Sequence, residues 1–304
     1  MARLPLGKDG LRGAVLLEKG THEVAGQLFI RASGVVLRGS GPGAGGTVLL
    51  GTGFMRANLL TISGRADRKT DAAQAITADY VPVNARTVRV ANAAAFKVGD
   101  RVVVSRPSTA AWIKTLGMET FGGGLSALGW KAGQRDIHWD RQVVAIDANG
   151  LTLDAPLTTA LDKAYGGGTV ARVSWPGLIS QVGVENLQLE STTDAENPKD
   201  ENHRWVAIDL ENAQDAWVRQ VAFRHFAGSA VLAHATVRRL TVEDCRSTEP
   251  VSEIGNERRN TFYTLGSQTL FQRLYTENGY HDFAVGYCAA GPNAFVQCEA
   301  EQAL

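Results

Sequence analysis

Short apolar runs recur along this sequence with polar turns between them, and this recurrence constrains the fold more than any other feature. After residue 180 the runs share the pattern V-x-x-V/L-x-L/F/V. Irregular coils of about 20–35 residues, each holding short strands, are typical of a β-solenoid. Copies of the pattern occupy 184–189, 218–223 and 237–242, with weaker ones at 271–276 and 295–300, so that their starts are 34, 19, 34 and 24 residues apart.

The competing all-β folds fit this recurrence less well. A propeller blade needs about 40–45 regular residues with four strands, and the Asn-Gly dipeptides of tight hairpins are nearly absent after residue 180. We therefore expect strands that stack in parallel on the previous coil, with apolar ladders inside. Turn insertions should then gather on one face and build a binding groove.

Residues 66–175 break the rhythm. They are richer in Asp, Arg and Trp, and Asn149-Gly150 joins two short apolar runs, which is a hairpin signal. We expect an inserted small antiparallel β domain with a long loop here, between coils in 1–65 and coils in 176–304. Neither end carries a cap, so we expect the chain to be a fragment of a longer solenoid.

The charge balance excludes several classes of protein. Among 304 residues, 31 Lys+Arg face 31 Asp+Glu, so no global basic field favours nucleic acid. No apolar run approaches the ~18 residues of a membrane-spanning helix, and the N-terminus lacks the apolar core of a signal peptide. The cysteines Cys245, Cys288 and Cys298 form no disulfide framework, and we interpret them as small buried side chains.

Two segments carry a resemblance to a known family. RGAVLLEKGT at 12–21 is followed by ASGVVLRGSG at 32–41, and coils continue from 183 to 300. This arrangement resembles the pectate lyase-like superfamily of right-handed parallel β-helix proteins. The resemblance implies a right-handed parallel β-helix in a secreted or periplasmic protein, with a signal peptide upstream of this sequence. Members are mostly polysaccharide lyases or hydrolases, and some are phage tailspikes or adhesins.

Two reactions suit a groove that holds an extended sugar chain. The β-elimination of a uronate needs a base and a cation that neutralises the carboxylate. The cation is either Ca²⁺ held by carboxylates or an arginine or lysine. Hydrolysis needs two carboxyl groups on either side of the scissile bond.

The strongest candidate cluster is the turn at 249–260. Arg258 and Arg259 can clamp a uronate carboxylate through two parallel hydrogen bonds. Glu253 and Glu257 are candidates for an acid, a base or cation ligands. The alternative is a solvated polar turn with mutual salt bridges.

A second cluster, 278–283, follows about one coil later. Stacked strands lie about 4.8 Å apart, so these residues should approach the 249–260 turn. We expect His281 and Asp282 to form an acid/base pair, and Tyr280 to stack on a sugar or donate a proton. The alternative is a plain Asn-Gly turn with a satisfied histidine.

A third cluster, 197–205, follows the strand-like run at 184–189. Lys199, His203 and Arg204 are candidate bases or carboxylate binders, and Trp205 is a candidate stacking platform. The alternative is a mobile charged loop in solvent.

In the insert, Trp112 and Trp130, with His138, can form an aromatic wall over the groove; the alternative is the core of a small domain. We interpret His225 and His234, which adjoin apolar strand residues, as structural.

The sequence thus favours a lyase that cleaves an acidic, uronate-containing polysaccharide. One alternative is a glycoside hydrolase that uses Glu253, Glu257 and Asp282. The other is a glycan-binding or structural solenoid without catalysis. The expected partner is a polysaccharide or oligosaccharide, and the oligomeric state stays open.

Overall fold

The computed structural model describes residues 3–43, 45–120, 128–148 and 150–303. The chain divides into two compact units. The insert was predicted to span 66–175. The second of the two units also includes a later segment, Tyr287–Pro292, that no sequence signal indicated. Unit 1 comprises Met1–Ala66, Gly177–Gly286 and Asn293–Leu304, and unit 2 comprises Asp67–Pro176 and Tyr287–Pro292.

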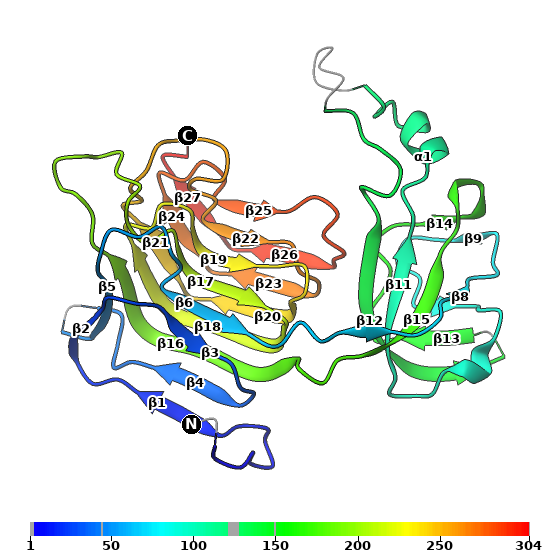
Figure 1. The fold of residues 1–304 in the computed structure, drawn as a ribbon, viewed down its shortest axis with the longest axis horizontal. Helices are drawn as coiled ribbons and strands as arrows, with labels where there is room; N and C mark the ends of the chain where they lie inside the picture. Colours follow the sequence, from blue (N-terminus) through cyan, green and yellow to red (C-terminus); the bar gives the residue numbers. More distant parts are fainter. Residues whose placement is uncertain (1–2, 44, 121–127, 149, 304) are drawn as a thin grey trace. The chain divides into compact units, whose positions relative to one another are not determined.

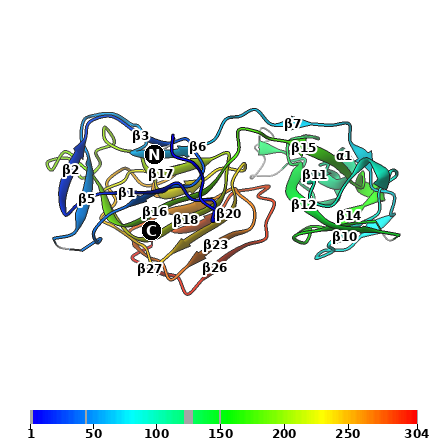
Figure 2. The same ribbon diagram turned by 90° about the horizontal axis from the view of Figure 1, so that it is seen from below.

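Unit 1 is a parallel β-helix built from two sheets (Figures 1 and 2). Sheet A has 12 strands and bends midway along its longest ones. Its first part contains β1 (Gly13–Leu16), β4 (Val35–Arg38), the first half of β16 (Ile179–Ser191), the first half of β18 (Ala213–Arg224), β20 (Arg238–Glu243), β23 (Thr269–Gln272) and β26 (Asn293–Val296). Its second part contains β2 (Gly20–Val24), β5 (Thr47–Gly51), the later halves of β16 and β18, β21 (Arg246–Thr248), β24 (Tyr275–Glu277) and β27 (Glu299–Glu301).

Sheet B closes the coils on the other side. Its six strands also pair in parallel, each with the strand one coil away. The predicted parallel β-helix with an inserted antiparallel domain is therefore confirmed. The strands are β3 (Leu28–Ile30), β6 (Leu60–Ser63), β17 (Val206–Glu211), β19 (Ser229–Ala233), β22 (Phe262–Thr264) and β25 (Phe283–Val285).

The register of sheet A corrects one copy of the predicted repeat. Val184 lies opposite Val218, which lies opposite Val242, and the ladder continues to Phe271 and Phe295. The copy that was predicted to start at 237 was therefore wrong, because 242 occupies the equivalent position. Turns of unequal length separate the coils, and spacing alone does not reveal which of two valines is in register.

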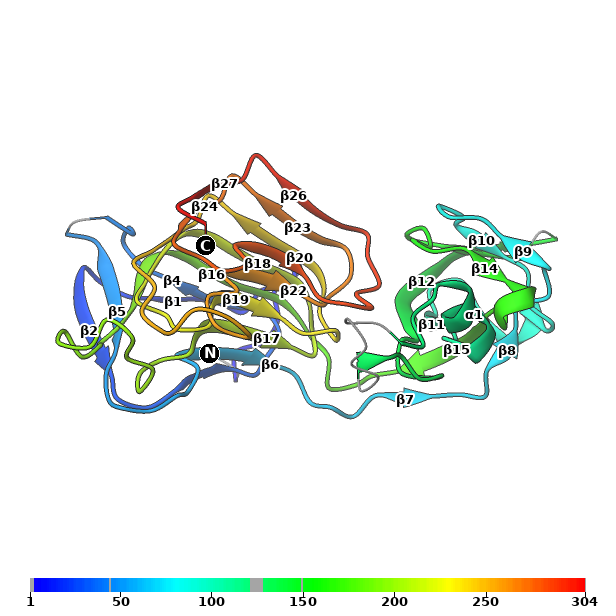
Figure 3. The same ribbon diagram turned by 90° about the horizontal axis from the view of Figure 1, so that it is seen from above.

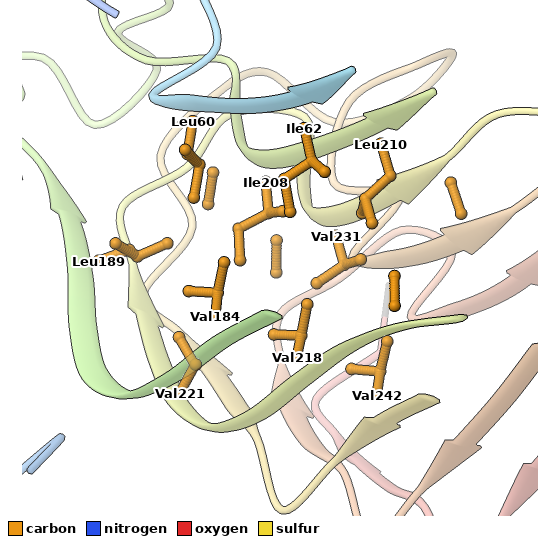
Figure 4. Packing of buried hydrophobic residues seen from close by; sticks show 14 of the residues in the cluster. Leu60, Ile62, Val184, Leu189, Ile208, Leu210, Val218, Val221, Val231 and Val242 are labelled. Carbon is orange, nitrogen blue, oxygen red and sulfur yellow. The ribbon is translucent and has the colours of Figure 1, made fainter. Parts of the chain in front are cut away.

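The core of unit 1 lies between the two sheets. Because successive strand residues point to opposite faces, every second side chain enters the core. Figure 4 shows Leu60, Ile208 and Leu210 of sheet B facing Val184 and Val218 of sheet A. The packing of these ladders removes apolar surface from water, and each Å² removed stabilises the fold by about 25 cal/mol.

Non-glycine residues in the left-handed region bend each coil at equivalent positions. A single such residue turns the chain without an insertion, so each coil changes direction at the same place. One column lies at the bend of sheet A and another where its second part ends. The columns are Asn186, Gln220, Asp244, Arg273 and Gln297, and then His225, Glu249, Asn278 and Gln302.

Unit 2 is a small antiparallel β structure (Figure 3). All of its strand pairs among the described residues are antiparallel. Its elements are β7 (Lys69–Thr70), β8 (Gln74–Ala75), β9 (Tyr80–Val81), β10 (Thr87–Val88), β11 (Arg101–Arg106), α1 (Ala110–Thr115), β12 (Ile137–Asp147), β13 (Gly150–Leu153), β14 (Leu161–Asp162) and β15 (Thr169–Ser174), with 3₁₀ turns at Ala93–Ala95 and Lys163–Tyr165. The predicted hairpin joins β12 and β13, although Asn149 lies outside the described residues.

Arg141 fastens the later segment of unit 2 to its strands. This fully buried side chain donates to the carbonyls of Pro156 and Gly291 at 2.7 and 2.8 Å. Thr158 adds a bond from its hydroxyl to the carbonyl of Ala290 at 2.8 Å. Buried backbone carbonyls need donors, which explains why a charged residue occupies this core position.

Among the described residues, no helix is long and apolar enough to cross a membrane. Of the three cysteines, Cys245 is buried, and burial raises the pKa of its thiol to about 12. Cys288 and Cys298 are partly exposed.

Candidate functional site

Six loops stack on one another where the second part of sheet A turns into sheet B. We name this region the stacked-loop corner. The clusters predicted at 197–205, 249–260 and 278–283 all belong to it, so the structure brings together three segments that the sequence separates. Its loops are 25–27, 52–59, 192–205, 225–228, 249–261 and 278–282.

Glu201 lies at the centre of the corner and joins two of these loops to a third. Its carboxylate accepts from Arg56 Nη2 at 2.8 Å and from Arg258 Nη2 at 3.1 Å, and Arg258 Nε is a further donor. The hydrogen bonds from Arg258 hold the pKa of this buried carboxyl below its usual value. Two guanidiniums thus share one carboxylate, which leaves the group with a net positive charge.

The indole of Trp205 lies against both guanidiniums. Its ring centroid is 5.4 Å from Arg56 Cζ and 5.9 Å from Arg258 Cζ. The short turn at Gly228 makes room for the indole, because a Cβ there would approach Trp205 Nε1 to 2.6 Å. Among the described residues, Nη1 of Arg56 and Nη1 of Arg258 have no hydrogen-bond acceptor. The Trp205 ring is therefore partly exposed and has free guanidinium donors beside it.

His281 lies in the next loop of the same corner. Its backbone N–H donates to the carbonyl of Arg259 at 3.1 Å, next to Arg258 in the chain. Its exposed imidazole donates from Nδ1 to Asn260 Oδ1 at 2.8 Å, so Nε2 carries the free lone pair. The ring of Tyr280 stands edge-on to it, with centroids 4.4 Å apart.

The carboxylates predicted for catalysis do not converge. Asp282 is buried and accepts from Thr261 at 3.2 Å and from Thr276 at 2.7 Å. The expected pair with His281 is therefore wrong, because that imidazole bonds to Asn260 instead. Glu253 pairs with exposed Lys199 at 3.1 Å, and Glu257 is exposed.

Three residues predicted to bind substrate have internal roles. His203 is buried, with Nε2 2.9 Å from the carbonyl of Val251. Arg204 is fully buried and donates to backbone carbonyls of the two preceding loops. Arg259 donates to the carbonyl of Ser252 at 2.8 Å and to that of Asn278 at 3.2 Å. A buried side chain cannot contact a substrate, so we assign His203 and Arg204 to the framework of the loops.

The two tryptophans predicted as an aromatic wall belong to unit 2. Trp112 and Trp130 stack on each other with centroids 5.8 Å apart. Arg106 Cζ lies 4.2 Å from the Trp112 ring, and Arg135 Cζ lies 5.4 Å from the Trp130 ring. Both rings are partly exposed and lie outside the buried core of this unit, which contains Trp139 instead, so they do not form the small-domain core that was the alternative.

A second histidine site escaped the sequence interpretation. Asp209 points outward from β17, since its neighbours Ile208 and Leu210 enter the core. It accepts from His234 Nε2 at 2.8 Å and from Asn58 at 2.9 Å. The bond from Asp209 raises the pKa of His234 above its usual value. Arg56 and Asn58 were missed as well, because the coil that supplies them precedes the insert and its register was unknown.

Arginine supplies the positive charge of the corner. Within the described parts of the chain, no three His, Cys, Asp or Glu side chains are grouped to hold a metal ion. Arg56 and Arg258 offer free donors, so arginine side chains can supply the cation that β-elimination needs.

The ion-paired carboxyls predict a loss of stability in acid. The pKa values of Glu185, Glu201 and Glu249 are all lowered. A lowered pKa contributes stability above the unfolded-state value, and this stability is lost as the pH falls below about 4. We expect the midpoint of thermal unfolding, followed by circular dichroism, to fall steeply between pH 5 and pH 3. Glu201→Gln should flatten that fall, and an unchanged slope in the variant would contradict the role of Glu201.

Comparisons with known proteins complete the description. No family model matches the chain, and no curated protein matches it. Similar solved structures include three phage tailspikes, and the chain spans about half the length of each of these three. They include gp49 of Pseudomonas phage LKA1 (TM-score 0.42, 11% identity, 94% of this chain and 50% of that chain). Two others are gp61 of Pseudomonas phage phi297 (0.39, 11%, 90% and 44%) and Gp54 of Acinetobacter baumannii bacteriophage AP22 in complex with a capsular saccharide (0.35, 8%, 95% and 53%).

Proposed function

We propose that the chain binds an acidic polysaccharide at the stacked-loop corner and cleaves it by β-elimination. The observation that carries the proposal is the indole of Trp205 beside Arg56 and Arg258, which share Glu201 and keep a net positive charge. The C–H face of a sugar ring packs on an indole, and a uronate carboxylate accepts charge-assisted hydrogen bonds from guanidinium groups.

The neighbouring loop supplies the groups for proton transfer. His281 Nε2 removes the proton from the carbon next to the carboxylate, while Arg258 stabilises the negative charge that develops on the carboxylate oxygens. The electron pair of that C–H bond forms the double bond, and the glycosidic C–O bond at the adjacent carbon breaks. Tyr280, whose ring adjoins His281, donates a proton to the leaving oxygen.

The hydrolase alternative receives no support from the carboxylates. Glu253 is held by Lys199, Asp282 by two threonines, and Glu257 projects into solvent. A hydrolase needs an acid and a second carboxylate about 5–9.5 Å apart across one bond. The corner instead presents bases and cations.

An assay on uronate polymers tests the proposal. Elimination creates an unsaturated uronate that absorbs in the ultraviolet, so absorbance should rise when the chain meets polygalacturonate, alginate or a related acidic glycan. Binding to all of these polymers without any unsaturated product would reduce the protein to a glycan-binding solenoid. New reducing ends without ultraviolet absorbance would indicate hydrolysis and overturn the proposal.

Arg258→Gln should weaken both substrate binding and turnover. It removes one guanidinium of the pair and leaves Arg56 to neutralise Glu201, so we expect kcat/KM to fall by roughly 10- to 100-fold, equivalent to one charge-assisted contact. Initial rates on polygalacturonate measure this. Arg172→Gln is the matched control, because Arg172 is an exposed, ion-paired arginine of unit 2. Equal rates in the two variants would remove Arg258 from the site.

A further inference from the structure

A second tryptophan lies on the outer face of sheet A, outside the stacked-loop corner. Trp217 on β18 lies opposite Gly183 on β16, and its ring covers that glycine. A Cβ on Gly183 would meet Trp217 Cε2 at 2.1 Å and Nε1 at 2.3 Å. The ring therefore rests directly on the backbone of the neighbouring coil, where any larger residue would displace it.

Glu185 fixes the ring in this position. Trp217 Nε1 donates to Glu185 Oε2 at 2.9 Å, so the indole has a defined orientation although it is partly exposed. Arg219 Nε donates to the same oxygen at 2.7 Å, and Arg38 Nε donates to the other oxygen. Burial of Glu185 raises its pKa, but the bonds from Trp217, Arg219 and Arg38 outweigh burial and keep it lowered.

The two guanidiniums retain unused donors that face solvent. The side chains of Arg38 and Arg219 are 48% and 44% exposed, whereas that of Glu185 is 4% exposed. Among the described residues, neither Nη1 nor Nη2 of these arginines has an acceptor. Glu243 lies opposite Arg219 on the next coil, but it accepts hydrogen bonds from Gln272 and Arg273, so Glu185 alone is shared by Arg38 and Arg219 beside the indole.

This arrangement repeats the chemistry of the stacked-loop corner with different residues. In both places a buried glutamate joins two arginines from different coils, and a tryptophan lies against the group. A purely structural ladder needs neither an exposed ring nor free Nη groups. We infer that Trp217, Arg38 and Arg219 form a second binding site for a carboxylate-bearing glycan. The choice of a uronate glycan as the ligand rests on the proposed function.

Substitutions at the ring test the second site by binding rather than by turnover. The probe is polygalacturonate in affinity electrophoresis of the full chain, with neutral dextran as the control polymer. We expect Trp217→Ala to weaken retardation about tenfold in dissociation constant, as for the loss of one stacking contact. Gly183→Ala keeps every ligand-binding group but displaces the ring, so it should weaken binding to a similar extent. Trp217→Phe, which keeps a ring and loses the bond to Glu185, should fall between these variants and the wild type.

Circular dichroism and the thermal midpoint establish that each variant is folded. Arg273→Gln removes an exposed, ion-paired arginine from the same sheet and should bind as the wild type does. Wild-type affinity in both folded Trp217→Ala and Gly183→Ala would overturn the second site. If Arg258→Gln alone weakens binding, the second site fails and the stacked-loop corner stands. If the Trp217 variants alone weaken binding, the second site stands and the proposed function fails.

Discussion

Arg204→Met is expected to lower the free energy of unfolding by about 2 kcal/mol, because the two N–H groups of Nη2 lose backbone carbonyl acceptors at about 1 kcal/mol each. Arg204 Nη2 lies 3.1, 2.7 and 2.7 Å from the carbonyl oxygens of Val24, Ala25 and Thr52. One side chain thereby ties the loop at 192–205 to the two loops of earlier coils. Methionine keeps the aliphatic stem and removes the donors.

Urea unfolding followed by circular dichroism measures this change. Arg172→Met, at an exposed ion pair of unit 2, is the matched control and should change stability by about 0.5 kcal/mol or less. A buried guanidinium is costly, and burial lowers the pKa of Arg204. If Arg204→Met is as stable as the wild type, the free energy lost by desolvating the guanidinium equals the free energy contributed by its hydrogen bonds. The stability of the loops would then not depend on this residue.

His281→Gln is expected to reduce kcat by about 10²–10⁴-fold, the range that a positioned general base supplies. Glutamine keeps a donor for Asn260 and lacks a basic nitrogen. KM should change little, since Arg56, Arg258 and Trp205 still bind the substrate. Initial rates of formation of unsaturated product, measured across substrate concentrations, separate the two parameters.

His234→Gln is the matched control for that experiment. His234 is an imidazole of unit 1 that is also held by a partner side chain and partly open to solvent, at Asp209 on sheet B. We expect its loss to change kcat much less than the loss of His281. A variant pair with the opposite ranking would transfer the role of base to His234 and contradict the role of His281.

The strand ladders could be predicted from sequence because most inward positions are apolar, although Ser247 and Thr276 continue the column of Phe223 in the later coils. Val184 and Val218 start similar runs, and they are indeed in register. The ladder then moves to Val242 rather than to the valine at 237, because the coil after Val218 is longer than the interval that the repeat pattern indicated. The sequence pattern therefore predicts that the coils stack, but the geometry of the turns decides which residues of neighbouring strands are in register.

The candidate site could be located from sequence but not assembled. Polar turns after apolar runs correctly indicated the three loops that stack at the corner. The sequence did not indicate the partner of Arg258. This partner, Glu201, accepts hydrogen bonds from both Arg258 and Arg56, and Arg56 lies 145 residues before Glu201, on the other side of the insert. The charge of those turns also suggested exposed side chains. Arg204 is instead buried, and it donates hydrogen bonds to backbone carbonyls of neighbouring coils.

One signal for the second tryptophan site was present in the sequence. Gly183 and Trp217 are separated by the same 34 residues as Val184 and Val218. A glycine one coil before a tryptophan permits the ring to lie on the strand, where a side chain would exclude it. The flanking ladder of Arg38, Glu185 and Arg219 follows from the same register.

Mass spectrometry of the fragments released from polygalacturonate distinguishes elimination from hydrolysis. Elimination breaks the chain without adding water, so the new non-reducing end should be one water molecule lighter than a saturated uronate. We predict such unsaturated fragments with the wild type and their loss with His281→Gln. Fragments that all carry the added water, or an intact polymer after prolonged incubation with every acidic glycan, would contradict a lyase at the stacked-loop corner.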